Sequence, residues 1–162
     1  MTRSAKILIC GGIALAAFGM LYGLHYAVFI EHQTLDRMGG ALADGFVHTA
    51  QRRMPEARAA IDAYGWTKYN YVRQVDVHSH WIGLAMLMIV TGAAFERVGF
   101  SERWRRWIAL ALLSGSILFP FGVIVQTATH GGRFASGLAV AGSALVTGAL
   151  AACAIGFLRQ SS

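Results

Sequence analysis

Four long apolar runs dominate the pattern of hydrophobic and polar positions, and each is long enough to cross a bilayer. The first, residues 7–30, contains no Asp, Glu, Lys or Arg. At about 1.5 Å per residue, a helix of that length covers a hydrocarbon core of about 30 Å. The other spans are predicted at about 75–96, 107–128 and 134–158. The pattern therefore predicts an all-α fold, a four-helix transmembrane bundle that forms a single integral-membrane domain over residues 1–162.

The segment between the first two spans, about 31–74, is rich in polar residues and too long for a simple connector. We expect it to form a helical cap on the external side of the membrane. One helix is predicted over residues 35–53, and a second from Pro55, a favourable first helical position, to about Tyr64. Aromatic residues that suit the membrane surface then follow, namely Trp66, Tyr69 and Tyr71.

The composition supports a chain that lies in lipid. Hydrophobic residues make up 56% of the sequence and charged residues only 14%. Soluble domains carry about 25% charged residues, so this chain has too few polar side chains to cover a surface in water. The apolar content also excludes a disordered protein, because disordered chains are poor in such residues.

The charges are distributed unevenly along the chain, whose formal net charge is +6. Basic and acidic residues balance in the long loop, whereas basic residues predominate at the opposite ends of the spans. Because Lys and Arg crowd the cytoplasmic ends of spans, we expect both termini to be cytoplasmic, in a bacterial-type inner membrane. The basic character then reflects topology and contact with the lipid bilayer, and no recognition module points to nucleic acid. The basic residues on the expected cytoplasmic side are Arg3, Lys6, Arg97, Arg103, Arg105, Arg106 and Arg159.

Small residues recur at helical spacing on two of the predicted spans. Small residues at intervals of three or four let helix backbones approach closely in lipid. We expect both sets to pack helices within one subunit, with an oligomer interface as the alternative. The sets are Gly12, Ala16, Gly19 and Gly23 on the first span, and Gly137, Ala141, Ala144 and Gly148 on the fourth.

All six histidines fall on the expected external side. The positions are His25, His32, His48, His78, His80 and His130. Ionisable groups at membrane depth are costly and tend to face the bundle interior or a cavity. The spans can therefore bring several imidazoles to one depth, and imidazole is a common ligand of haem iron, copper and zinc. Any single histidine is more simply explained as a hydrogen-bonded structural group, but the one-sided set favours a cofactor site.

The segment Asp76-Val-His-Ser-His80 is the sharpest of these features. Asp76 and His80 are four residues apart and share a helix face, so the carboxylate can orient the ring or act as a ligand. His78 and His80 are separated by about 200° around a helix and cannot both face one interior. Asp44 and His48 repeat the spacing of four. The candidate cofactor ligands are thus His78, His80, His25 and His130, and a metal could use His78, His80, Asp76 and His48.

The chain favours haem b over other cofactors. It contains no Cys-x-x-Cys-His segment, so covalently attached haem is excluded. Cys10 and Cys153 lie at the other ends of their spans, away from the histidines, and are expected to serve packing. An imidazole embedded among apolar and aromatic residues suits haem b best, and copper held by several histidines is the alternative.

The layout resembles the styrene oxide isomerase family of small four-span membrane proteins with a long first external loop. The likeness is best from Val77 to Ala109, where His78-Ser79 opens the second span and the run Gly83-Leu-Ala-Met-Leu-Met88 follows. The resemblance implies a trimer in which His78 ligates haem b, and a ferric iron that acts as a Lewis acid on an epoxide, which rearranges to an aldehyde. The family has asparagine where this chain has Leu84, and a polar segment where it reads Leu118-Phe-Pro-Phe-Gly122.

These observations lead to three functional hypotheses. The first is a haem b-binding protein that acts as an isomerase on a small apolar epoxide-like substrate and forms a homo-oligomer. The second is a carrier with two histidine ligands that exchanges electrons with a redox partner or within a respiratory complex. The third is a copper-binding or assembly subunit of a larger membrane complex.

Overall fold

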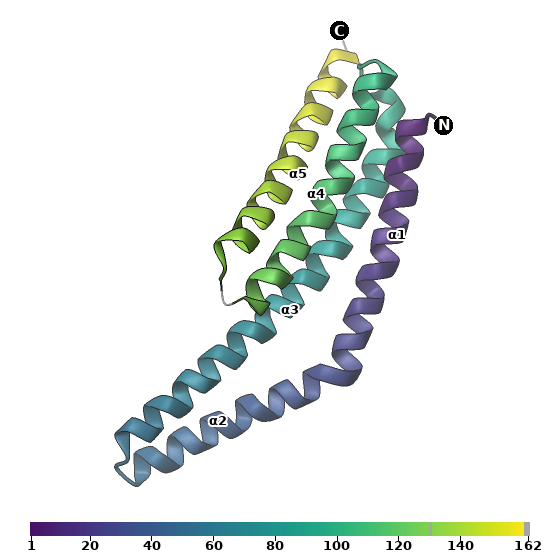
Figure 1. Cartoon of the computed structure of the whole chain (residues 1–162). Helices are drawn as coiled ribbons and strands as arrows, with labels where there is room; N and C mark the ends of the chain where they lie inside the picture. Colours follow the sequence, from purple (N-terminus) through teal and green to yellow (C-terminus); the bar gives the residue numbers. More distant parts are fainter. Residues whose placement is uncertain (130, 161–162) are drawn as a thin grey trace. The chain divides into compact units, whose positions relative to one another are not determined.

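The computed structural model describes residues 1–129 and 131–160, and within them every regular element is a helix (Figure 1). Four helical stretches in this part of the chain are long and apolar enough to cross a membrane. The predicted all-α fold with four spans is therefore confirmed. The elements are α1 (Arg3–Tyr26), the π-helix η1 (Ala27–Glu31), α2 (His32–Ala50), α3 (Met54–Ala94), the 3-10 helix η2 (Phe95–Arg97), α4 (Glu102–Ala128) and α5 (Arg133–Gln160).

The chain divides into two compact units, one formed by Met1–Met20 with Val77–Ser162 and the other by Leu21–Asp76. In the first unit, most of α1, the second half of α3, α4 and α5 lie side by side (Figure 1). Its core includes the fully buried side chains of Leu8, Met88 and Leu112. The candidate spans are thus supported by helix packing inside this unit.

Close backbone approach joins α1 to α3 in the first unit. A Cβ atom at Gly12 would lie 2.8 Å from the carbonyl oxygen of Ala85, closer than carbon and oxygen can pack. Seven residues further on, a Cβ atom at Gly19 would lie 3.0 Å from Cβ of Trp81. The prediction that small residues of the first span pack helices within the subunit is therefore confirmed at these two positions.

The α4 and α5 helices also pack at backbone distance, but through a different face of α5 from the one expected. A Cβ atom at Gly122 would lie 2.5 Å from the Ala139 nitrogen, and one at Gly142 would overlap the backbone of Phe119. The buried seam of α5 repeats every seven residues, as knobs-into-holes packing requires. It consists of Ala135, Gly142, Ala149 and Gly156.

The predicted packing role of the other α5 set is wrong. Gly137, Ala141, Ala144 and Gly148 are all exposed in the chain, and a Cβ atom at Gly137 or Gly148 would meet nothing within 4 Å. Small residues line more than one face of α5, so spacing alone does not identify the face that meets α4.

Polar contacts fasten the start of α1 to the start of α4. The carboxylate of Glu102 accepts hydrogen bonds from the Ser4 backbone N–H and from the Ser4 hydroxyl, both at 3.0 Å. The Arg105 guanidinium lies 3.4 Å from the same carboxylate. Ser4 is fully buried, so this carboxylate satisfies helix-end donors that would otherwise be costly.

The second unit contains the C-terminal end of α1, η1, α2 and the first part of α3. The predicted second cap helix does not end near Tyr64, because α3 runs without a break from Met54 to Ala94. The segment after Tyr64 contains no proline, and Gly65 alone costs a helix only about 1 kcal/mol. The change from polar to apolar composition therefore marks a change in the surroundings of one continuous helix, and not the end of a helix.

Hydrogen bonds from tyrosines tie the elements of the second unit together. The Tyr22 hydroxyl of α1 donates to the Gln74 side chain of α3. The Tyr71 hydroxyl donates to the Glu31 carboxylate at 3.0 Å, and Glu31 ends η1. Tyr71 was expected to mark the membrane surface, and its hydroxyl here joins two helices.

Candidate functional site

His78 lies on α3, and its ring is fixed by a backbone group of α1. The Nδ1 atom is 2.8 Å from the carbonyl oxygen of Gly19. A carbonyl oxygen can only accept a hydrogen bond, so Nδ1 carries the proton of the neutral ring. The lone pair of that tautomer then resides on Nε2, which is the atom available to bind a metal or accept a proton.

The local packing explains how a backbone carbonyl reaches this ring. Gly19 is buried, and a Cβ atom there would lie 3.0 Å from Cβ of Trp81 and 3.2 Å from Cδ1 of Ile82. The Trp81 side chain is only 3% exposed and meets the ring of Phe18 edge-on, with centroids 4.8 Å apart. Glycine at position 19 and the tryptophan beside it therefore set the spacing that the hydrogen bond needs.

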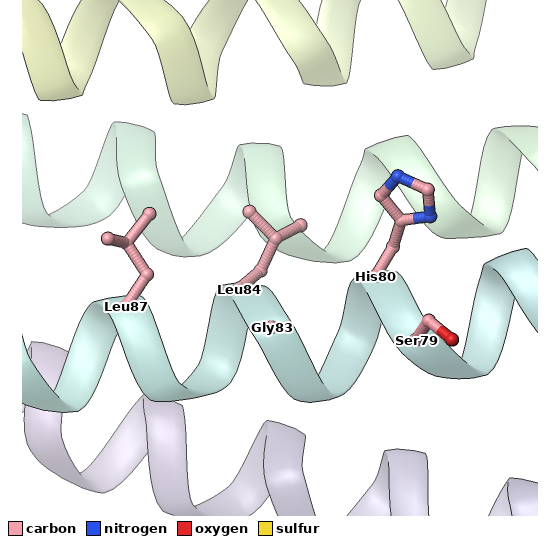
Figure 2. Close-up of a pocket in the computed structure, with 5 residues that line it drawn as sticks. All are labelled: Ser79, His80, Gly83, Leu84 and Leu87. Carbon is pink, nitrogen blue, oxygen red and sulfur yellow. The ribbon is translucent and has the colours of Figure 1, made fainter.

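His80 lies on another face of α3 and lines a groove. The groove has a volume of about 340 Å³ and is formed by Ser79, His80, Gly83, Leu84 and Leu87. Figure 2 shows the side chains of His80, Leu84 and Leu87 pointing to the same side, toward the ribbon of α4. The His80 ring meets Phe119 of α4 edge-on, with centroids 4.9 Å apart. The groove is therefore apolar along its length and has an imidazole at one end.

The two histidines of the motif are directed to different helices. His78 contacts α1 through Gly19, whereas His80 contacts α4 through Phe119. This confirms the expectation that a separation of about 200° around a helix prevents both rings from facing one interior. One iron atom cannot therefore take both as ligands from the same α3.

The other predicted ligands lie elsewhere. His25 and His48 belong to the second unit, as does Asp76, its last residue. His25 is exposed and its ring lies 5.3 Å from that of Phe29. His48 is half-buried on α2, and within the described residues its buried Nδ1 atom has no hydrogen-bond partner. His130 lies outside the described residues.

A site made of several metal-binding side chains is not found in the part of the chain that the structure describes. Among those residues, no three His, Cys, Asp or Glu side chains lie close enough to hold one ion together. The proposed set of His78, His80, Asp76 and His48 is thus not brought together as a cluster within the described residues. A single imidazole needs no such cluster, and the hydrogen bond to Gly19 leaves Nε2 of His78 as the acceptor nitrogen of its ring.

Three participants in this region were not predicted from the sequence as site residues. They are the Gly19 carbonyl, the Phe119 ring and the Leu87 side chain. The spacing of Gly12 and Gly19 signals a close helix approach, but no pattern of residue types identifies which carbonyl will accept a hydrogen bond. Leu84 lines the groove beside His80.

Comparison with known proteins identified no relative: no family model, no curated protein and no solved structure matches the chain.

Proposed function

We propose that the protein binds haem b in the membrane, with Nε2 of His78 as an axial ligand. The observation that carries this proposal is the 2.8 Å hydrogen bond between Nδ1 of His78 and the carbonyl oxygen of Gly19. Metal-binding histidines commonly donate their second ring N–H to a carbonyl or carboxylate, which fixes the tautomer and raises the basicity of the ligand nitrogen. The His78 ring has that arrangement before any metal arrives.

The groove beside His80 would hold a small apolar substrate against the haem of a neighbouring subunit in the proposed homo-oligomer, because His78 and His80 of one chain are directed to different helices. Its floor is formed by Leu84 and Leu87, and a Cβ atom at Gly83 would meet nothing within 4 Å. Four stretches of this chain suit a bilayer, so an apolar molecule can reach such a groove from the lipid. The leucines would hold its hydrocarbon part, while the His80 ring and the Ser79 hydroxyl offer the polar groups at the end of the groove.

A bound ferric haem with an open coordination position would supply Lewis-acid chemistry toward an epoxide oxygen. The residues of this chain would orient the substrate and exclude water, since the groove lining is largely aliphatic. The substrate class is therefore a small apolar epoxide, in agreement with the family resemblance. The reaction would be an isomerisation to a carbonyl compound.

The competing function is electron transfer by an iron that has two histidine ligands. Within one chain, His78 and His80 are directed to different helices, which disfavours this pair as the two ligands. The absorption spectrum of the purified, haem-loaded protein separates the two functions. We expect a high-spin ferric spectrum; a low-spin spectrum would support the carrier, and the lack of any haem absorption would contradict both.

We further propose that the start of α1 and the end of α5 face the cytoplasm of a bacterial cell. Both ends lie at the same end of the first unit (Figure 1). Arg103, Arg105, Arg106 and Arg159 also belong to this unit and lie close in sequence to the ends of α4 and α5. Reporter fusions after Gln160 should be active only for a cytoplasmic reporter; activity of a periplasmic reporter would contradict this orientation.

A role as an assembly subunit is a second candidate, and the surface of α2 supports it. Within the second unit, Phe46 is 75% exposed, and Leu35 and Leu42 are also exposed on the same helix. These positions recur at intervals of seven and four residues, so they form an apolar stripe that a partner could cover. Purification of a stable complex that contains a larger partner and no haem would favour this role over the proposed one.

A homo-oligomer is the third element of the proposal. The exposed α5 set of Gly137, Ala141, Ala144 and Gly148 has the spacing that allows close helix approach between subunits. We expect light scattering in detergent to give a protein mass that is a multiple of the chain mass. The resemblance to the styrene oxide isomerase family implies a trimer, and therefore three times the chain mass. A monomer at all concentrations would contradict it.

A further inference from the structure

Two adjoining cavities lie at the end of the first unit where α4 begins and α5 ends. One has a volume of about 500 Å³ and is lined by Phe100, Trp104, Ile108, Ala152 and Arg159. The other has a volume of about 540 Å³ and is lined by Arg103, Trp104 and Trp107. Trp104 borders both, so the two form one continuous basic and aromatic surface. They are distinct from the groove beside His80.

The link before α4 builds one wall of this surface. The Gly99 N–H donates to the Gly156 carbonyl of α5 at 2.9 Å. A Cβ atom at Gly156 would overlap the side chain of Val98, which is 2% exposed. This docking places the Phe100 ring against Arg159, whose guanidinium carbon is 5.3 Å from the ring centroid. The guanidinium is therefore held over an aromatic face at the rim of the cavity.

The two arginines at the rims, Arg103 and Arg159, make no salt bridge within the described residues. The nearby acidic side chains are engaged elsewhere. Glu102 is bound by Ser4 and Arg105, and Glu96 accepts a hydrogen bond from the Thr2 N–H at 2.7 Å. The surface thus keeps two positive charges that are available to an external anion.

Aliphatic and aromatic groups continue from these charges along the helices. Ile108 and Ala152 line the first cavity with Arg159 and Trp104, and Trp107 lines the second cavity. Both tryptophans are exposed. Tryptophan prefers the level of the lipid headgroups, and basic pockets between spans bind anionic headgroups. We propose that this surface between α4 and α5 is a specific site for an anionic phospholipid, with its phosphate between Arg103 and Arg159 and an acyl chain against Ile108 and Ala152.

Quenching of tryptophan fluorescence by brominated lipids tests this site. The chain has four tryptophans, and two of them border the surface. Purified protein is placed in phosphatidylcholine vesicles and titrated with phosphatidylglycerol that carries brominated acyl chains. Brominated phosphatidylcholine serves as the lipid control. Retained phosphatidylglycerol is also counted by native mass spectrometry, which does not depend on fluorescence.

We expect brominated phosphatidylglycerol to quench at lower mole fraction than brominated phosphatidylcholine. Arg103→Gln and Arg159→Gln should each weaken this preference about fivefold, which corresponds to about 1 kcal/mol for each basic residue near a membrane surface. Trp104→Phe should remove much of the quenching. The matched control Arg133→Gln removes an exposed arginine from the other end of α5 and should leave the preference unchanged. Arg159→Lys keeps the charge and should retain most of it.

Several results would overturn the site. Equal quenching by both lipids would show that no headgroup is selected. An equal loss in Arg133→Gln would show a general charge effect. Displacement of the lipid by millimolar inorganic phosphate would show that a free anion, and not a phospholipid, is the ligand. If Arg103→Gln and Arg159→Gln fold and keep the full preference, the assignment of the two arginines is wrong.

Discussion

The Nδ1 atom of His78 lies 2.8 Å from the carbonyl oxygen of Gly19, which joins α3 to α1 through a side chain and a backbone group. This contact determines which ring nitrogen carries the proton and leaves the Nε2 lone pair for a ligand. It also depends on the absence of a side chain at position 19. The consequences of that dependence can be measured directly.

Substitution Gly19→Ala should weaken haem retention and destabilise the fold. The new Cβ atom would lie 3.0 Å from Cβ of Trp81, so the atoms around it must shift by a few tenths of an ångström. Overpacking of this kind costs about 1–3 kcal/mol. Haem content after purification and thermal unfolding measure the two effects. Gly65→Ala in α3 is the matched control, because a Cβ atom there meets nothing within 4 Å and alanine favours a helix. Equal behaviour of the two variants would contradict the role of Gly19.

Substitution Gly83→Leu should block the groove without disturbing the proposed haem ligand. A Cβ atom at Gly83 meets nothing within 4 Å, so the backbone of α3 is not strained. With styrene oxide as the probe, the initial rate of aldehyde formation should fall at least about tenfold, the effect of about 1.4 kcal/mol on a barrier. The haem absorption spectrum should stay unchanged. An unchanged rate in a variant with normal haem content would place the substrate elsewhere.

Substitution Gly122→Ala should destabilise the contact of α4 with α5. The added methyl group would lie 2.5 Å from the Ala139 nitrogen, a backbone atom that cannot rotate away. We expect a loss of about 1–3 kcal/mol in unfolding free energy, measured by denaturant titration in mixed micelles. Gly39→Ala on α2 provides the comparison and should lose nothing, because a Cβ atom there meets nothing within 4 Å. A loss as large in Gly39→Ala would contradict the role of the close approach at Gly122.

Substitution Ser4→Ala should loosen the start of α1. The fully buried Ser4 hydroxyl donates to the Glu102 carboxylate at 3.0 Å, and such bonds to charged groups contribute about 1.5–3 kcal/mol. Protease sensitivity near residue 4 and the thermal midpoint report this change. Ser143→Ala removes an exposed hydroxyl from α5 and is the control. An unchanged midpoint in Ser4→Ala would show that the backbone N–H bond to Glu102 suffices.

The spans and the divergence of the two motif histidines could be predicted because each follows from one dominant physical rule. Charge-free runs must cross lipid as helices, and residues two apart on a helix point in opposed directions. The continuous α3 could not be predicted, because the polar-to-apolar change near Val75 resembles a helix end although no helix-breaking residue is present. At that point the side chains change from polar to apolar, whereas the helical backbone of α3 continues.

Neither the packing face of α5 nor the hydrogen-bond partner of His78 could be predicted from the sequence, and the reasons differ. On α5, Ala135, Gly142 and Ala149 form a seven-residue repeat, but a second set of small residues competes with it. The Gly19 carbonyl has no residue-type signature, because every residue has such a group. Only the distance between α1 and α3 selects it.

The most direct test of the haem proposal compares haem retention in His78→Ala and His80→Ala. Both variants are expressed with added haem and purified identically, and haem is measured from the absorption of its pyridine complex relative to protein. His78→Ala should lose nearly all haem, whereas His80→Ala should keep it, because the His80 ring contacts Phe119 of α4 and not the α1 side of α3. Full haem retention in His78→Ala, or selective loss in His80→Ala, would contradict the assignment of His78 as the axial ligand.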